Sequence, residues 1–232
     1  MNPSPTPHPY YAQRRDALVA DFEECLARAA PKFAQLLPQH PLASLKPELI
    51  AEFDRVLATL PYAGGAQGRM TPFFEQATGF FAVGRVLRSH GVPIEVNGPL
   101  MRETFMARLV NLPESERHAL GHRWLTPENQ AALRELAAAS QTRENPGDFV
   151  YRFVEAGKTE SGAAFDFGID YSECGFCKLS KANGDEDLLP VMCAMDNESY
   201  GLRGIKLYRT RTLAGGDTHC NFRFSAKAEA KS

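Results

Sequence analysis

Hydrophobic residues recur every three or four positions through the first part of the chain, which is the spacing of one helix face. Between Tyr10 and Ala30, the residues Leu18, Phe22 and Leu26 follow this spacing and predict an amphipathic helix. The same pattern predicts further helices over residues 47–60, 71–91, 99–109, 113–121 and 126–139. The first part of the chain is therefore expected to be a helical bundle.

Two of these helices begin with a threonine followed by a proline. Thr71 is expected to cap one helix with Pro72 in its first turn, and another helix is expected to start from Thr126 with Pro127 in its first turn. A hydroxyl at the cap position accepts a hydrogen bond from a backbone N–H of the first turn. Proline is tolerated in the first turn because the N–H that it lacks would have no partner within the helix.

After the turn-forming residues 142–147, hydrophobic and polar residues alternate, which is the period of a β-strand. Phe149, Tyr151 and Phe153 share one face of such a strand. Two antiparallel hairpins are expected, one from 149–154 to 165–171 through the polar residues 157–162, and one from 205–211 to 220–224 through Gly215 and Gly216.

The expected fold is α+β, an N-terminal helical bundle packed on a C-terminal antiparallel sheet with a cysteine-bearing helical insert. Alternating prolines in residues 1–9 indicate a disordered or extended arm, because proline donates no backbone hydrogen bond and prefers extended chain. A helical region over 10–145, a sheet region over 146–226 and a tail over 227–232 follow. Residues 10–226 are expected to form one compact domain.

Charge and composition narrow the class of partner. The formal net charge is -2, so the long-range field that attracts nucleic acids or anionic membranes is missing, and a small-molecule substrate is the expected partner. No apolar run approaches the ~20 residues that cross a bilayer, and the chain starts without a secretion signal. A cytoplasmic location is expected, and assembly into a homo-oligomer is left open.

Four of the five cysteines gather in the last quarter of the chain: Cys174, Cys177, Cys193 and Cys220. Without a secretion signal, such a group is more typical of metal binding, thiol chemistry or a reactive pocket than of a disulfide scaffold. We therefore expect the functional site in this region.

Cys193 and Asp196 are the first candidates for catalysis. If Asp187 caps a helix that holds Pro190 in its first turns, Cys193 lies near the positive helix end, where the dipole lowers the pKa of a thiol. Asp196, three residues later, projects from the same face and could accept a proton or bind a cationic group. The alternative is that Cys193 is a small buried apolar residue among hydrophobic neighbours.

The pair Cys174-x-x-Cys177 has a spacing that suits zinc or a redox-active dithiol. Cys193 with Cys220 or His219 could supply the remaining zinc ligands, although the gaps match no finger or ribbon spacing. We expect no cofactor, with zinc as the alternative, and regard one reactive thiol lined by the others as the main hypothesis.

Further residues are candidates for substrate binding. Gly64 and Gly65 could let the backbone approach a ligand, with Tyr62 as a wall for a flat ring, although a plain tight turn explains the glycines equally well. Cys220 is expected on the buried face of its strand and His219 on the opposite face at the rim.

Two stretches resemble the L-2-amino-thiazoline-4-carboxylic acid hydrolase family, and the likeness in order and spacing extends over most of the chain. The first is Leu60-Pro61-Tyr62-Ala63-Gly64-Gly65 with the helix after Thr71. The second comprises residues 174–179, residues 189–193 with Asp196, and residues 213–216 with Cys220 and the four residues 221–224 after it.

The resemblance implies hydrolytic opening of a small heterocycle, in which water attacks the amidine-like carbon of a thiazoline ring and gives a carbamoyl-cysteine. On chemical grounds Cys193 would attack this carbon or activate water beside Asp196, with Cys174 or Cys177 nearby, and Arg69 or Arg209 would hold the substrate carboxylate. The expected activity is hydrolysis of C–N bonds in cyclic amidines or amides. Asn221 stands where the family often has aspartate, and if that acid helps to position the substrate, the specificity of this chain differs.

Two other classes of function remain open. The strand, the cysteine-bearing helix and the closing hairpin are also similar to 4-vinyl-reductase-like domains, which hold small hydrophobic molecules without hydrolysing them. A zinc-stabilised interaction protein is the second alternative, and it would unfold when a chelator removes the metal.

Overall fold

The computed structural model describes residues 5–227, and within this range the chain is α+β. The described part contains eight α-helices and a four-stranded antiparallel sheet, with helices first and the sheet in the C-terminal part. Helices α7 (Gly175–Asn183) and α8 (Leu189–Leu202) are inserted between two strands of the sheet. The expected fold class, including the cysteine-bearing helical insert, is therefore confirmed.

The described chain divides into two compact units. Each unit combines several segments, and their boundaries differ from the expected division between a helical region and a sheet region at residue 145. Unit 1 holds the described residues up to Arg108, together with Asn145–Gly147 and Lys178–Val191. Unit 2 holds Leu109–Glu144, Asp148–Cys177 and the described residues from Met192 on. The single compact domain expected over residues 10–226 stays a prediction.

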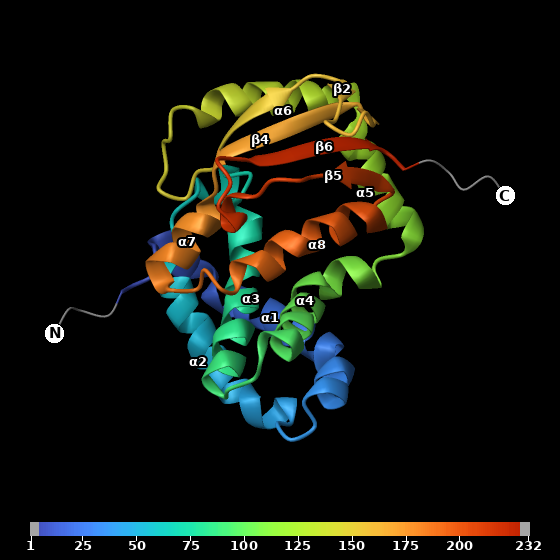
Figure 1. Cartoon of the computed structure of the whole chain (residues 1–232). Helices are drawn as coiled ribbons and strands as arrows, with labels where there is room; N and C mark the ends of the chain where they lie inside the picture. Colours follow the sequence, from blue (N-terminus) through green and yellow to red (C-terminus); the bar gives the residue numbers. More distant parts are fainter. Residues whose placement is uncertain (1–4, 228–232) are drawn as a thin grey trace. The chain divides into compact units, whose positions relative to one another are not determined.

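Unit 1 is built from long helices (Figure 1), and aromatic side chains contribute to its core. Its helices are α1 (Pro9–Leu36), α2 (Leu42–Thr59), α3 (Thr71–Ser89) and most of α4 (Ile94–Asn111). Phe22 of α1 stacks on Phe53 of α2 with ring centroids 5.1 Å apart. Both side chains are buried, as are Phe74 and Phe80 of α3, so the hydrophobic faces identified in the sequence form the core of the unit.

Three helices extend past prolines at which the sequence placed a boundary. Helix α1 continues beyond Pro31 because Phe33 and Leu37 at its end are both buried, which compensates for the backbone hydrogen bond that proline removes. Helices α2 and α4 begin five residues before Pro47 and Pro99, which fall in their early turns.

The start of the chain and the start of α3 differ in detail from expectation. Residues 1–4 of the expected arm lie outside the described residues, and Pro9 is already the first residue of α1, with the His8 side chain accepting a hydrogen bond from the backbone N–H of Tyr10. Thr71 is not a cap. Met70 occupies that position, and the buried Thr71 hydroxyl instead donates to the carbonyl oxygen of Ala63 at 3.0 Å.

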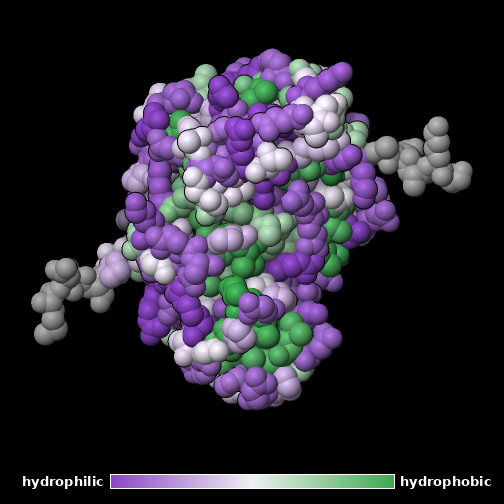
Figure 2. Space-filling view, in the orientation of Figure 1, coloured by the Kyte–Doolittle hydropathy of each residue, from purple (hydrophilic) through white to green (hydrophobic). Residues whose placement is uncertain are grey.

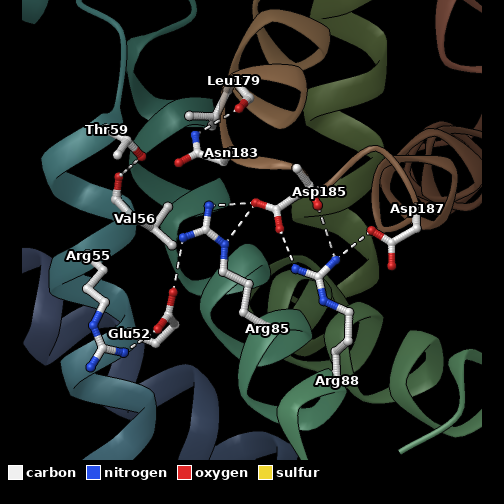
Figure 3. Close-up of polar contacts among 11 residues, drawn as sticks. Glu52, Arg55, Val56, Thr59, Arg85, Arg88, Leu179, Asn183, Asp185 and Asp187 are labelled. Carbon is white, nitrogen blue, oxygen red and sulfur yellow. Dashed lines mark hydrogen bonds and ion pairs between the residues drawn. The ribbon is translucent and has the colours of Figure 1, made fainter. Parts of the chain in front are cut away.

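An ion-pair network ties the segment after α7 to helix α3 (Figure 3). The carboxylate of Asp185 has 1% of its side chain exposed and accepts hydrogen bonds from both Arg85 and Arg88. Arg85 also binds Glu52 at 3.0 Å, and Arg88 also binds Asp187 at 2.6 Å. Unit 1 thus contains a buried carboxylate shared by two arginines.

Unit 2 contains the sheet, with strand order β1-β4-β6-β5 and every pair antiparallel. The strands are β1 (Val150–Val154), β4 (Phe167–Glu173), β6 (Cys220–Ala226) and β5 (Ile205–Tyr208), and a small second sheet pairs β2 (Gly157–Lys158) with β3 (Ala164–Phe165). Strands β4, β6 and β5 lie side by side in Figure 1. Both expected hairpins are present.

The two faces of this sheet differ in chemistry because successive side chains of a strand point to opposite sides. On one face Phe167 stacks against Phe153 at 5.6 Å, and Tyr200 of α8 lies 4.9 Å from Phe224. On the other face the carboxylate of Asp170 binds Arg152 at 2.8 Å. One face therefore carries the aromatic core of unit 2.

Helices α5 (Glu114–Leu125) and α6 (Pro127–Ser140) complete unit 2. Thr126 caps α6, since its side chain accepts a hydrogen bond from the backbone N–H of Asn129 at 3.2 Å. At the C-terminal end, Lys227 donates a backbone hydrogen bond to Gly204, and residues 228–232 of the expected tail lie outside the described residues.

Hydrophilic residues cover most of the molecular face shown in Figure 2, with smaller hydrophobic areas between them. Among the helices of residues 5–227, none combines the length and the apolar character required to cross a membrane.

Candidate functional site

Cys193 and Asp196 lie one helical turn apart on α8, and one arginine binds both positions. Arg209, which directly follows β5, donates from Nη1 to the Asp196 carboxylate and from Nη2 to the Cys193 carbonyl oxygen at 2.5 Å. Only 6% of the Arg209 side chain is exposed. The ion pair thus fixes the position of the Asp196 carboxylate beside Cys193.

Two neighbours hold Arg209 in this position. Its guanidinium carbon lies 5.0 Å from the centroid of the Phe222 ring. The Asn221 side-chain oxygen accepts hydrogen bonds from the backbone N–H groups of Thr210 at 3.0 Å and Arg211 at 2.7 Å, and the Asn221 amide donates to the Thr210 hydroxyl. Asn221 therefore shapes the chain that leaves β5, and these contacts give it a local structural role.

The Asp196 carboxyl has an altered acidity. Burial raises the pKa of Asp196 to about 6, and the nearby positive charge of Arg209 offsets part of this increase. Because 36% of the side chain remains exposed, the carboxylate lies among protein atoms but still reaches solvent. A carboxyl group with a pKa near 6 is mostly ionised at neutral pH and can accept a proton from a bound water.

The Cys193 thiol behaves differently from the expectation. Burial, together with the negative charge of Asp196, raises the pKa of Cys193 to about 12. The lowered pKa expected from the helix dipole is therefore wrong. Cys193 is the fifth residue of α8, beyond its first turn, and Asp187 binds Arg88 instead of capping the helix.

Cys174 and Cys177 form a pair at the start of α7. Cys174 directly precedes the helix, and its sulfur accepts a hydrogen bond from the backbone N–H of Cys177. The two thiol groups are also hydrogen-bonded to each other, and both cysteines are free. The sulfur atoms therefore already lie next to one another without a covalent bond.

Cys220 completes the group of four thiols. Its sulfur accepts a hydrogen bond from the backbone N–H of Leu213 at 3.1 Å, and burial raises its pKa. Cys220 and Cys177 both influence the pKa of Cys193 electrostatically, which places them in the same region of unit 2. The structure thus brings the four cysteines together, and their catalytic roles stay predictions.

In the described part of the chain, no three His, Cys, Asp or Glu side chains are arranged so that they could hold a metal ion.

The predicted binding residues fall into two groups. His219 directly precedes β6 and lines a cavity of about 330 Å³ with Arg152, Asp170 and Ser172. Two other cavities, of about 480 and 370 Å³, are lined by other residues, and neither Cys193 nor Asp196 contributes to any of these three.

Tyr62, Gly64, Gly65 and Arg69 belong to unit 1. The Tyr62 ring stacks on the imidazole of His8 with ring centroids 4.1 Å apart. The His8 ring therefore occupies the place beside Tyr62 where the flat ring of a ligand was expected. Gly64 and Gly65 both have positive φ angles, 90° and 58°, which glycine adopts without strain. Their part in one site with the cysteines stays a prediction.

Sequence reasoning missed the partnership between Arg209 and Asp196. From the sequence, Arg209 was proposed to bind a substrate carboxylate. In the structure it binds the carboxylate of Asp196 instead. The only signal in the sequence is the alternation of Arg209 and Arg211 after a predicted strand, which indicates a side-chain direction but not a partner.

Comparison with known proteins gives one family. The model of the family described as L-2-amino-thiazoline-4-carboxylic acid hydrolase matches residues 94–224, more than half of the chain. No curated protein and no solved structure matches. The matched range includes Cys174, Cys177, Cys193, Asp196 and Cys220, and it excludes the stretch from Tyr62 to Arg69.

Proposed function

The chain belongs to the L-2-amino-thiazoline-4-carboxylic acid hydrolase family, and from this premise we propose that it opens a small cyclic amidine or cyclic amide at Asp196 and Cys193. The family name supports a hydrolase. The observation that carries the proposed site is a partly exposed carboxylate with a pKa of about 6, held by Arg209 one helical turn from a cysteine.

In the proposed reaction Asp196 acts as the general base. It removes a proton from a water molecule while the water oxygen forms a bond to the amidine carbon, and the electrons of the C=N bond move to nitrogen. Asp196 then passes that proton to the nitrogen. The hydroxyl oxygen on the tetrahedral carbon re-forms a C=O bond while the ring C–N bond breaks, and the hydroxyl proton is transferred through Asp196 to the departing nitrogen. One water is consumed, and the ring opens.

Arg209 has the role of a positioning residue in this scheme. Its hydrogen bonds to Asp196 and to the Cys193 carbonyl oxygen keep the carboxylate at one place beside the helix. Its charge also keeps the pKa of Asp196 from rising further, so the base is ionised at neutral pH.

The acidity of Cys193 favours water as the attacking group. With a pKa of about 12, the thiol is almost entirely protonated at neutral pH, and a thiol is a much weaker nucleophile than a thiolate. We therefore assign Cys193 to the wall of the site, where its S–H can donate a weak hydrogen bond to the substrate.

A substrate carboxylate needs a different cation from Arg209, which already binds Asp196. Arg69, the other arginine proposed from the sequence, is exposed and keeps this role as a prediction.

The test uses purified full-length protein and a panel of thiazolines, hydantoins and related cyclic amides, with ring opening followed as the mass of one added water. Asp196→Asn should lower turnover by at least about a hundredfold, the usual contribution of a general base. Cys193→Ser should retain measurable turnover, because the thiol does not attack.

Two matched variants serve as controls. Asp166→Asn makes the same change at an exposed aspartate of unit 2, and Cys25→Ser replaces a cysteine of unit 1. Both should leave turnover unchanged. Full activity of Asp196→Asn would reject the proposed base. Binding of the ring compounds by the wild-type protein without any mass change would favour a binding domain instead.

A further inference from the structure

We propose that Cys174 and Cys177 are a redox-active pair that closes reversibly to an intramolecular disulfide, with Cys177 as the attacking thiol and Cys174 as the resolving thiol. This inference concerns covalent chemistry of the protein itself and does not depend on the hydrolytic reaction.

The geometry of α7 places the two sulfur atoms together. Cys174 precedes the first residue of the helix, and Cys177 follows three positions later, so both side chains lie over the same turn. The thiols are hydrogen-bonded to each other, and the Cys177 backbone N–H donates to the Cys174 sulfur. The pair is therefore held side by side before any bond forms.

The two thiols of the pair are not equivalent. The Cys174 thiol donates its hydrogen bond to the Cys177 sulfur, which lowers the pKa of Cys177 and raises that of Cys174. The N-terminal end of α7 adds a positive partial charge that favours a thiolate in the first helical turn. Cys177 is thus the sulfur that ionises first.

The remaining cysteines provide the contrast. All five cysteines of the chain lie within the described residues. Burial raises the pKa of Cys25, Cys193 and Cys220. Cys177 alone among the five has a lowered pKa, and it is also half-buried rather than sealed. An oxidant that reaches the protein should therefore react first at this sulfur.

A low-molecular-weight disulfide of the glutathione type is a sufficient oxidant. The Cys177 thiolate attacks one of its sulfurs, forms a mixed disulfide and releases one small thiolate. The Cys174 thiol then loses its proton and attacks the Cys177 sulfur, which releases the second small thiol. The protein loses two hydrogens, and the oxidant is reduced to two thiols.

The experiment uses the full-length wild-type protein, fully reduced and then incubated with glutathione disulfide. After alkylation of the remaining thiols, peptide mass mapping identifies any new bond. The protein should lose two of its five free thiols, and the new bond should join Cys174 to Cys177. Retention of all five thiols, or a bond that involves Cys193 or Cys220, would overturn the proposal.

Single variants test the direction of attack. Cys174→Ser should accumulate a mixed disulfide of glutathione at position 177, because no resolving thiol remains. Cys177→Ser should remain unmodified at Cys174. Cys25→Ser is the matched control and should still form the disulfide. Equal modification of the first two variants would reject the assigned order, and the wild-type mapping remains decisive if a variant fails to fold.

Discussion

Replacing Asp185 with asparagine measures how strongly the buried carboxylate of unit 1 stabilises the fold. Asp185 accepts hydrogen bonds from Nε of Arg85 at 2.8 Å, from Nη2 of Arg85 at 2.5 Å and from Nη2 of Arg88 at 2.8 Å (Figure 3). Asparagine has nearly the same shape. It removes the negative charge and turns an NH2 group toward a guanidinium.

The size of the effect follows from burial. Removing one member of a buried ion pair costs about 3–5 kcal/mol, because the other charge is left without compensation. Here Arg85 keeps Glu52, and 39% of the Arg88 side chain is exposed to water. We therefore expect Asp185→Asn to lower the free energy of unfolding by about 3 kcal/mol, at the lower end of that range.

Asp187→Asn is the matched control, because Asp187 binds the same Arg88 but has 57% of its side chain exposed. Exposed pairs contribute about 0–1 kcal/mol, and salt screens them. Urea unfolding followed by circular dichroism at pH 7, at low and at ~1 M salt, compares the two variants. Equal losses of stability, or an Asp185 effect that disappears at high salt, would refute the argument from burial.

The raised pKa of Asp196 predicts two effects of pH. Turnover should rise with pH through about 6, because the carboxylate forms there. The stability that this group contributes is fully present below its ordinary pKa of 3.8, and it should be lost as the pH rises through about 6. Arg209→Met should move the midpoint of the rate profile to higher pH, and an unmoved midpoint would contradict the electrostatic role of Arg209. Gly121→Ala should destabilise the protein in a thermal melt, because its new Cβ would lie 1.7 Å from the carbonyl oxygen of Arg203. Gly201→Ala, also within a helix but with open space, should be neutral or stabilising by up to about 1 kcal/mol.

Local patterns in the sequence predicted most of the secondary structure. Both predicted hairpins form, because alternation depends on neighbouring residues. The errors involve contacts between distant residues. Thr71 was expected to cap its helix, and it instead donates to Ala63, a carbonyl eight positions earlier that the local pattern could not reveal.

The candidate site shows the same division. Helical spacing was enough to place Cys193 and Asp196 on one face of a helix. Their acidities were not predictable, since burial and the charge of Arg209 act only after the chain has folded. A helix dipole can be inferred from the sequence, whereas desolvation by residues distant in sequence cannot.

Both outer strands of the sheet carry features that discourage added strands. Strand β5 has only four residues and exposes Lys206, while β1 has a register irregularity between Val150 and Tyr151 and an Arg152 side chain that is 75% exposed. Short length, edge charges and bulges each interrupt the row of free backbone groups that another chain would need for pairing. The sheet is thereby protected at its margins against amyloid-like stacking, even though its interior strands are rich in aromatic residues.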